Sequence, residues 1–261
     1  MKIVSFNINS IRARPHQIEH LRDTLDPDVI GLQETKVNDP EFPLEIVNEI
    51  GYHAEFWGQK GHYGVAILSK SKPKETIKGF INDTEDDQKR FIQSTFKFGD
   101  EDITIMNGYF PQGENINHET KFPKKIKFYN DLKDHIIDLK KTTSNLIIMG
   151  DFNDDPQSEA VRDHLVSIDF YNPMIFLLTR YAGSLTHRGD WYLFDQIILS
   201  PNWMKAYDNP LEYKKSAIYN PGALREQEGR FKGNPLRTYA GDNYLGGASD
   251  HFPVYVVFKK S

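Results

Sequence analysis

The sequence predicts an α/β fold in a single domain. Eight strand-length apolar runs rich in β-branched and aromatic residues recur along its 261 residues, and segments with the apolar spacing of amphipathic helices lie between them. Several runs are apolar at successive positions, which is typical of strands that are covered on both faces. No repeat and few long polar linkers interrupt this pattern, so we expect one domain over residues 1–261.

In the first half of the chain, strands dominate. The first strand is expected at residues 3–8. Pro15 then opens a helix with Ile18, Leu21 and Leu25 on one face, because proline is favoured in the first turn of a helix. The next strands are expected at residues 29–32, 63–69, 91–98 and 103–110.

The second half begins with a helix and ends with a strand. Phe128, Leu132, Ile136 and Leu139 form an apolar helical stripe. A strand at 146–149, a third helix at 160–166 and strands at 193–199 and 252–258 are expected after it. The least regular stretch, 206–247, is rich in Pro and Gly turn signals and is expected to consist mainly of loops.

Composition and charge exclude several classes of protein. The 17 Phe, 13 Tyr and 3 Trp supply more apolar surface than a disordered chain carries. Because there is no Cys, disulfides, thiolate zinc sites and thiol catalysis are excluded, and we expect a cytoplasmic protein. Apolar runs of about five residues are far shorter than the ~20 that span a bilayer, so we expect a soluble protein without a membrane partner. The net charge of −5 offers no general basic field, so a polyanion must be bound by a local patch or through a metal.

Polar side chains stand at the ends of the expected strands. They are Asn7 and Asn9, Gln33 and Glu34, Asn107 and Tyr109, Asp151 and Asn153, Asp195, and Asp250 with His251. In α/β sheets such ends gather at one edge, where sites form. Carboxylates without Cys and with few His suit a hard cation such as Mg²⁺. Such a site can stabilise charge on a phosphate while His251 or a carboxylate handles the proton of water, with Asp195 orienting the imidazole.

Each of these residues also has a purely structural interpretation. Glu34 alone could be a solvated strand end, and Asn7 could be a turn residue. Residues 150–156 could have a purely structural role, as a helix N-cap and a turn. The recurrence of the same residue classes at five strand ends favours a functional site.

Five segments resemble one known family. They are Ser5-Phe6-Asn7-Ile8-Asn9, Arg12 to Gln17, Gly31-Leu32-Gln33-Glu34-Thr35-Lys36, Gly58 to Ala66, and Asn107-Gly108-Tyr109-Phe110-Pro111-Gln112-Gly113-Glu114. Through about Pro156 the chain is similar to bacterial exonuclease III, the abasic-site endonucleases of the endonuclease/exonuclease/phosphatase superfamily. The resemblance implies a four-layer α/β sandwich, with two mixed β-sheets face to face and helices outside.

The resemblance also implies roles for individual residues. Asn7, Glu34 and Asp250 match metal-site positions, and Tyr109 matches a tyrosine at the scissile phosphate. Asp151 and Asn153 match the pair that activates water and holds the oxyanion. Asp195 matches the acid that orients the active-site histidine, His251. The implied cofactor is Mg²⁺, or Mn²⁺ in its place.

After Pro156 the chain departs from exonuclease III. Residues 184–191 replace the loop with which those enzymes grip DNA and the abasic sugar, and residues 220–247 resemble another bacterial branch of the superfamily. The catalytic positions are retained, whereas the recognition elements are not. This pattern is that of a recombined or engineered hybrid, or of a natural mosaic.

The predicted function is Mg²⁺-dependent phosphodiester hydrolysis in DNA repair. We expect abasic-site endonuclease and 3′–5′ exonuclease activity on duplex DNA, by a monomer. Predicted DNA contacts come from a lysine cluster, other polar side chains and one aromatic ring: Asn9, Arg90, Gln112, Lys121, Lys124, Lys125 and Trp191. Two alternatives remain, a phosphoesterase acting on RNA, a small molecule or a lipid head group, and a DNA-binding module with an inactive site.

Overall fold

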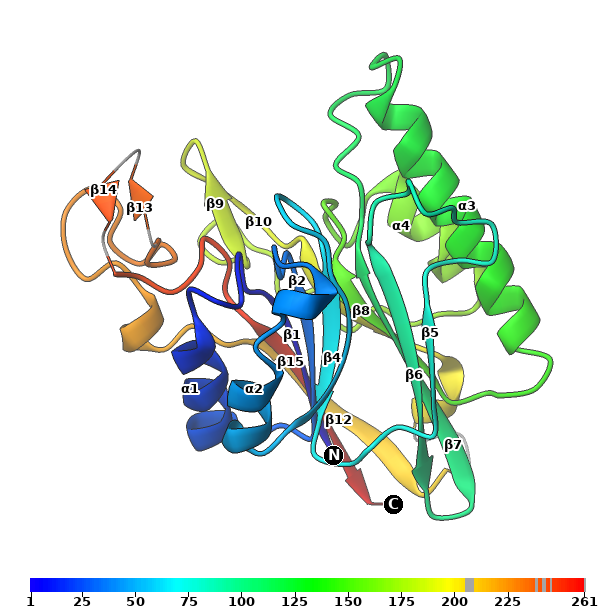
Figure 1. The fold of residues 1–261 in the computed structure, drawn as a ribbon. Helices are drawn as coiled ribbons and strands as arrows, with labels where there is room; N and C mark the ends of the chain where they lie inside the picture. The colour runs from blue at the N-terminus through cyan, green and yellow to red at the C-terminus, as the bar shows by residue number, and fades with distance from the viewer. Residues whose placement is uncertain (205–208, 238, 241–242, 245, 261) are drawn as a thin grey trace.

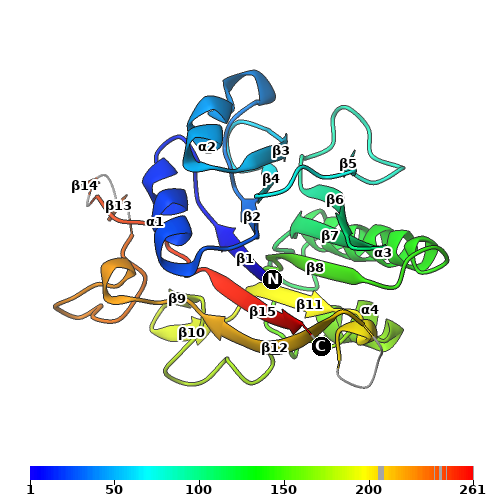
Figure 2. The ribbon, with the colours of Figure 1, turned by 90° about the horizontal axis from the view of Figure 1, so that it is seen from below.

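Two β-sheets lie face to face, and helices cover the outer face of each (Figures 1 and 2). The computed structural model describes residues 1–204, 209–237, 239–240, 243–244 and 246–260. The predicted α/β sandwich of four layers is therefore confirmed. Within the described residues, no helix combines the length and the apolar character needed to cross a membrane.

The first sheet has six strands in the order β12-β15-β1-β2-β4-β3. These are Leu211–Ile218, Val254–Lys260, Lys2–Asn7, Val29–Gln33, Val65–Ser69 and His53–Trp57. β1 and β2 are parallel and the other pairs are antiparallel, so the sheet is mixed. Helices α1 (Pro15–Leu25) and α2 (Leu44–Ile50) cover its outer face through buried apolar side chains.

The second sheet has five strands in the order β11-β8-β7-β6-β5. These are Asp195–Leu199, Leu146–Asp151, Glu101–Tyr109, Phe91–Phe98 and Glu75–Lys78. Only β7 and β8 are parallel among these pairs. Helices α3 (Lys121–Leu139) and α4 (Glu159–His164) cover it. Two short hairpins complete the described strands, β9 (Leu185–His187) with β10 (Asp190–Tyr192), and β13 (Tyr239–Ala240) with β14 (Asn243–Tyr244). Among the described residues, four 3-10 helices of three residues each lie between the other elements: η1 (Asp39–Glu41), η2 (Val166–Ile168), η3 (Pro201–Trp203) and η4 (Gly222–Leu224).

The core explains why so many strands are apolar on both faces. Ile3, Ile105 and Ile147 belong to an apolar layer between the two sheets, while Val4 and Ile148 face the helices on opposite sides of the sandwich. Central strands therefore bury every residue, as β1 does after Lys2 and β8 does throughout. At about 25 cal/mol per Å² of apolar surface, this burial is the main stabilising contribution to the fold.

All eight expected strands and all three expected helices are present, with ends shifted by a few residues. The elements that the sequence did not predict are β3, β5, β9, β10, β12, the two-residue strands and α2. The expectation of a loop-rich stretch at 206–247 is wrong for Leu211–Ile218, an edge strand whose alternation is broken by a bulge between Tyr213 and Lys215. Residues 206–208, 238, 241–242 and 245 of that stretch lie outside the described residues.

The topology brings strand ends from both sheets together. The two ends of the chain lie at the bottom of Figure 1, so β1 runs toward the top. Asn7 at the end of β1 pairs in register with Gln33 at the end of β2. At the same end of the second sheet, Asp151 of β8 lies between Tyr109 of β7 and Asp195 of β11.

Candidate active site

The structure gathers all eight predicted catalytic and metal-site residues at the top of the sandwich. Asn7, Glu34, Tyr109 and Asp151 lie at the carboxyl ends of β1, β2, β7 and β8, or directly after them. Asp195 begins the antiparallel strand β11, and Asp250 and His251 precede β15. Asn153 follows β8 by two residues. Strand ends from two sheets therefore contribute to one site, as predicted.

Asp195 and His251 form a buried pair. Nδ1 of His251 lies 2.7 Å from Oδ2 of Asp195, and both side chains are almost completely enclosed. Oδ1 of Asp195 has no hydrogen-bond partner among the described residues, so His251 is the main group that balances its charge. Burial by itself lowers the pKa of His251, but the charges of Asp195, Asp151 and Asp250 outweigh it and raise that pKa well above its usual value. The imidazole therefore keeps its proton at neutral pH.

Asp151 lies at the centre of the site beside Asn7. Nδ2 of Asn7 donates to Oδ2 of Asp151 at 2.9 Å and to Oε1 of Glu34 at 2.8 Å. Burial, opposed by the positive charge of His251 and reinforced by the charge of Asp195, raises the pKa of Asp151 to about 7. A carboxyl group that titrates near neutral pH is suited to accept a proton from water.

A chain of polar contacts connects Glu34 with Asp250. Nζ of Lys36 lies 2.8 Å from Oε2 of Glu34 and donates to Oδ1 of Asn9 at 2.6 Å. Nδ2 of Asn9 in turn donates to Oδ1 of Asp250 at 3.0 Å. Burial raises the pKa of Glu34, but Lys36 and Asn7 outweigh it, and the net direction is downward. Glu34 is thus an ionised carboxylate whose surroundings favour a neighbouring cation.

This donor set fits a hard divalent cation. Glu34 and Asp250 offer carboxylate oxygens, and the ammonium of Lys36 already places positive charge beside Glu34. Asn7 meets Glu34 through its amide nitrogen, and its side-chain oxygen accepts from the backbone N–H of Asn9, so Asn7 would have to turn its amide to add an oxygen ligand. Within the described part of the chain, no three His, Cys, Asp or Glu side chains converge into a complete metal site. Mg²⁺ does not require one, since it is usually held by one or two carboxylates and several waters.

Arg90 positions Tyr109. Its guanidinium group lies 4.7 Å from the ring centres of Tyr63 and Tyr109, and its Nη1 donates to the carbonyl of Tyr109 at 2.9 Å. Burial, together with the charges of Glu34 and Asp151, raises the pKa of the Tyr109 hydroxyl, which therefore stays protonated and can donate. The predicted contact of Arg90 with DNA stays a prediction.

Three residues of the site adopt left-handed backbone conformations. The φ angles of Asn9, Glu34 and Asn153 are 50°, 51° and 49°. Asn tolerates this region, whereas Glu does so at a cost, and such residues often cluster at functional sites. The turn at Asn153 is fixed by its backbone N–H, which donates to Oδ1 of Asp151, and by its side chain, which donates to the carbonyl of Phe110.

Sequence reasoning gave no role to three side chains that support the site. Gln33 and Asn107 are fully buried, and Nε2 of Gln33 donates to Oδ1 of Asn107 at 2.6 Å across the two sheets. Ser249 donates from Oγ to the carbonyl of Asn7 at 2.7 Å. These contacts lock the strands that carry Glu34, Tyr109 and Asp250. The signal was a polar residue inside an otherwise apolar run.

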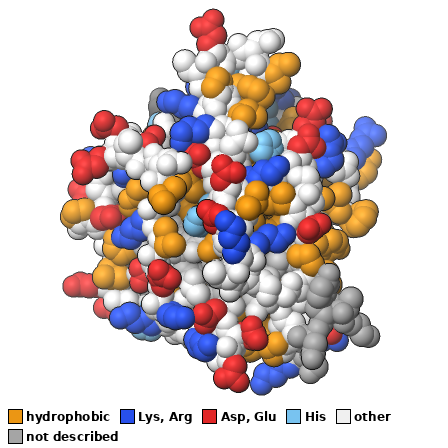
Figure 3. All heavy atoms as spheres, turned by 90° about the vertical axis from the view of Figure 1, so that its right-hand side faces the viewer, with side chains coloured by type: hydrophobic (Ala, Val, Ile, Leu, Met, Phe, Trp, Pro, Cys, Tyr) orange, Lys and Arg blue, Asp and Glu red, His pale blue; other side chains and the backbone are white. Residues whose placement is uncertain are grey.

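The predicted exposed lysine cluster is only partly present. Lys125 is 7% exposed and its Nζ lies 2.7 Å from Oδ1 of Asp154, so including it among exposed DNA-binding residues is wrong. Its position on α3 faces inward with Phe128 and Tyr129, as the helical period requires. Lys121 and Lys124 are exposed, and Lys121 pairs with Glu114. On the face over α3, basic and acidic side chains are mixed rather than separated (Figure 3).

Two other predicted DNA contacts lie on the surface. Gln112 is exposed in the segment between β7 and α3. Trp191 on β10 is half-buried, and its ring stacks on Phe252 with centroids 6.1 Å apart. The Trp191 ring is thus neither fully core nor fully exposed, and the residue on which it stacks, Phe252, directly follows His251.

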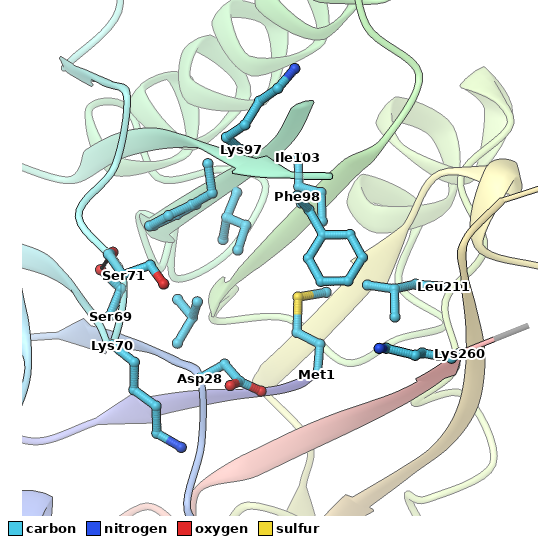
Figure 4. A pocket seen from close by; sticks show the side chains of 13 residues that line it. Met1, Asp28, Ser69, Lys70, Ser71, Lys97, Phe98, Ile103, Leu211 and Lys260 are labelled. Atoms are coloured by element: carbon cyan, nitrogen blue, oxygen red, sulfur yellow. Dashed lines mark hydrogen bonds between the residues drawn. The ribbon is translucent and has the colours of Figure 1, made fainter. Parts of the chain in front are cut away.

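A cavity lies away from these residues. It has a volume of about 250 Å³ and is lined by Met1, Phe98, Ile103 and Leu211, among others (Figure 4). Lys260 on its rim places it near the ends of the chain. None of the predicted site residues lines it, so converging polar chemistry, not cavity size, identifies the candidate site.

Comparison with known proteins gives consistent matches. A sequence model described as the Endonuclease/Exonuclease/phosphatase family matches residues 71–260. Exodeoxyribonuclease III of Haemophilus influenzae is 46% identical over 192 residues, which cover 74% of this chain and 70% of that protein. The fold is similar to that of a 3′–5′ exonuclease from Neisseria meningitidis, with a TM-score of 0.78, 24% identity and coverage of 99% of this chain and 100% of the other. An AP endonuclease from Archaeoglobus fulgidus gives a TM-score of 0.76, 25% identity and 99% coverage of both chains.

Proposed function

The chain belongs to the endonuclease/exonuclease/phosphatase family, and we propose that it is a DNA-repair nuclease that hydrolyses phosphodiester bonds in duplex DNA. The observation that carries this proposal is the arrangement of two hydrogen-bonded groups side by side: the Asp195–His251 pair, and Asn7 with Asp151 and Glu34. Asp195 and Asp151 are paired neighbours on β11 and β8, which joins the two groups. This set has the parts that phosphodiester hydrolysis requires, an acceptor for the proton of water and a place for positive charge beside the phosphate. The similarity to exodeoxyribonuclease III of H. influenzae supports DNA as the substrate.

We assign the proton acceptor to Asp151 rather than to His251. The raised pKa of His251 leaves its imidazole protonated, whereas Asp151 titrates at about 7 and is ionised in a large fraction of molecules at neutral pH. The imidazolium and the hydroxyl of Tyr109 then donate toward the phosphate oxygens, where negative charge develops. The backbone N–H of Asn153 donates to Oδ1 of Asp151 and holds this carboxyl group in place.

As a nuclease of this family, the protein depends on a divalent metal, and we propose Mg²⁺, with Mn²⁺ able to replace it. Glu34 would hold it together with Asn7 and Asp250, and Lys36 would move from Glu34 to a neighbouring anion. When bound, such a cation supplies positive charge that stabilises the developing charge on the phosphate.

The proposed substrates are duplexes with abasic sites or 3′ ends. The proposed active form is a monomer, since one chain supplies every described residue of the site. We expect Mg²⁺-dependent incision of a duplex that carries one abasic site, and complete loss of this activity with EDTA. Gel electrophoresis of end-labelled strands measures it, with an intact duplex, an RNA duplex and p-nitrophenyl phosphate assayed in parallel. Preferential hydrolysis of RNA or of the phosphomonoester, or DNA binding without cleavage, would contradict the proposal.

Trp191 is expected to contribute to abasic-site preference. Extruding a damaged nucleotide costs a few kcal/mol that pocket contacts must offset, and the half-buried ring of Trp191 stacks on Phe252, the residue after His251. The sequence predicts that residues 184–191 differ from the recognition loop of exonuclease III. On that prediction, we expect a smaller preference for abasic over intact duplex than in a typical exonuclease III. Trp191→Ala should reduce it further, by tenfold for each ~1.4 kcal/mol of lost differential contact.

Paired kinetics on abasic and intact duplexes measure this effect. Tyr192→Ala is the matched control, because Tyr192 is the next residue on β10, points to the opposite face and packs on Phe194. A preference equal to that of a typical exonuclease III and unchanged in Trp191→Ala would assign recognition to another segment.

A further inference from the structure

The segment between β12 and Asp250 lies along one side of the active site. Residues 219–237 and 246–248 lie on the left of Figure 1, the side of β13 and β14, while the segment before α3 rises on the right. The backbone N–H of Leu236 donates to the carbonyl of Leu224, and that of Ala248 donates to the carbonyl of Leu236, both at 2.8 Å. Leu224, Ala248 and Phe252 form a small apolar cluster against which Trp191 packs. The segment is thus attached to the chain that carries Asp250 and His251.

Gly247 fixes where this segment crosses the site. A Cβ atom at Gly247 would lie 2.2 Å from the carbonyl oxygen of Arg237 and 2.3 Å from that of Leu236. Such distances are impossible without moving the backbone, so only glycine permits this crossing. The main chain of Arg237 therefore lies directly against Gly247, which is three residues before Asp250 in the sequence.

The side chain of Arg237 reaches the β9 hairpin beside the site. Its Nη2 donates to the carbonyl of Thr186 at 3.2 Å, the one hydrogen bond of this guanidinium among the described residues. Leu185, the neighbour of Thr186, forms a β-bridge with His251. The residue is exposed, and a guanidinium carries five N–H donors, so most of them face solvent next to the site.

We propose that Arg237 binds a backbone phosphate of the DNA substrate, on the side of the active site opposite Lys121 and Lys124. This inference rests on the proposed function and deepens it. A planar guanidinium binds phosphate through two parallel hydrogen bonds, and its charge replaces a counterion of the DNA.

Equilibrium binding without metal tests the proposal separately from catalysis. A fluorescein-labelled duplex with one tetrahydrofuran abasic analogue is titrated with protein in EDTA at several salt concentrations. We expect Arg237→Ala to weaken binding about tenfold and to reduce the slope of log K against log salt by about 0.9, the value for one lost phosphate contact. Arg237→Lys keeps the charge but cannot form two parallel hydrogen bonds to one phosphate. Its slope of log K against log salt should therefore equal that of the wild type, while its affinity should lie between those of Arg237→Ala and the wild type.

Arg230→Ala is the matched control, because Arg230 lies in the same segment, is exposed and has its guanidinium over the Phe231 ring. It should match the wild type in affinity and slope. Arg237→Ala could leave the slope of log K against log salt unchanged and reduce only kcat for cleavage. This result would mean that Arg237 acts only on Asp250, and it would overturn the inference. If the wild-type protein cleaves the duplex but Arg237→Ala binds it as the wild type does, only this inference fails. A wild-type protein that neither binds nor cleaves DNA would overturn the proposed function as well.

Discussion

Glu34→Ala is expected to reduce metal-dependent DNA cleavage by at least ~10³-fold, since a metal ion contributes several kcal/mol to transition-state stabilisation and each ~1.4 kcal/mol is tenfold. Glu34 accepts a hydrogen bond from the Asn7 amide and pairs with the Lys36 ammonium, and it is held in place by a left-handed turn directly after β2. Removing it leaves a cation without its main anionic ligand. The site would then keep its proton acceptor but lose its positive charge.

The measurement is single-turnover cleavage of an abasic duplex over a range of Mg²⁺ concentrations. Glu49→Ala serves as the control, because Glu49 is an exposed carboxylate on α2, away from the site. The melting temperature of Glu34→Ala should stay close to that of the wild type, since the Glu34 side chain is partly exposed and its partner Lys36 can turn to water. Near-full turnover of Glu34→Ala at saturating Mg²⁺ would show that the metal is held elsewhere.

Much of the fold was predictable because central strands are apolar at nearly every position. β2, β4 and β8 bury all their residues, so their sequences are distinct from their surroundings. Edge strands lack this signal. β3 and β5 have no fully buried residue, and their assignment depends on pairing with a neighbour that the sequence does not reveal. β12 was missed for the same reason, together with its bulge.

The sequence predicted which residue types form the site, but it did not predict how their side chains are placed relative to one another. Acids and amides that end apolar strands, such as Asp151 and Glu34, are uncommon enough to indicate a site. The inward direction of Lys125 follows from three-dimensional packing, since Asp154 meets it from a different element. The contact of Arg237 with Thr186 joins residues 51 positions apart through an irregular segment, where no periodicity predicts the path of the chain.

The Asp195–His251 pair is expected to act as one unit in catalysis. His251→Gln and Asp195→Asn should each reduce kcat/KM by ~10²–10⁴-fold, the usual contribution of a positioned acid or base. The double variant should lose about as much as the more damaging single variant, because residues that act together are non-additive. Losses that multiply would argue against a working pair. Since removing one partner of a buried pair can cost ~3–5 kcal/mol of stability, the melting temperature of each variant is measured alongside.

The dependence of kcat/KM on pH separates the role of Asp151 as proton acceptor from that of His251 as proton donor. Asp151 must be ionised to accept a proton, so kcat/KM should rise as the pH increases through about 7, the pKa to which burial brings this carboxyl. His251 must be protonated to donate, so activity should fall again only where the pH passes the raised pKa of His251. In Asp195→Asn, burial still lowers the pKa of His251 while the strongest opposing charge is gone, and the alkaline limb should move to lower pH. Asp163→Asn, on the exposed surface of α4, should leave both limbs in place. An alkaline limb unmoved by Asp195→Asn would mean that His251 does not act as a proton donor held in its charged form by Asp195.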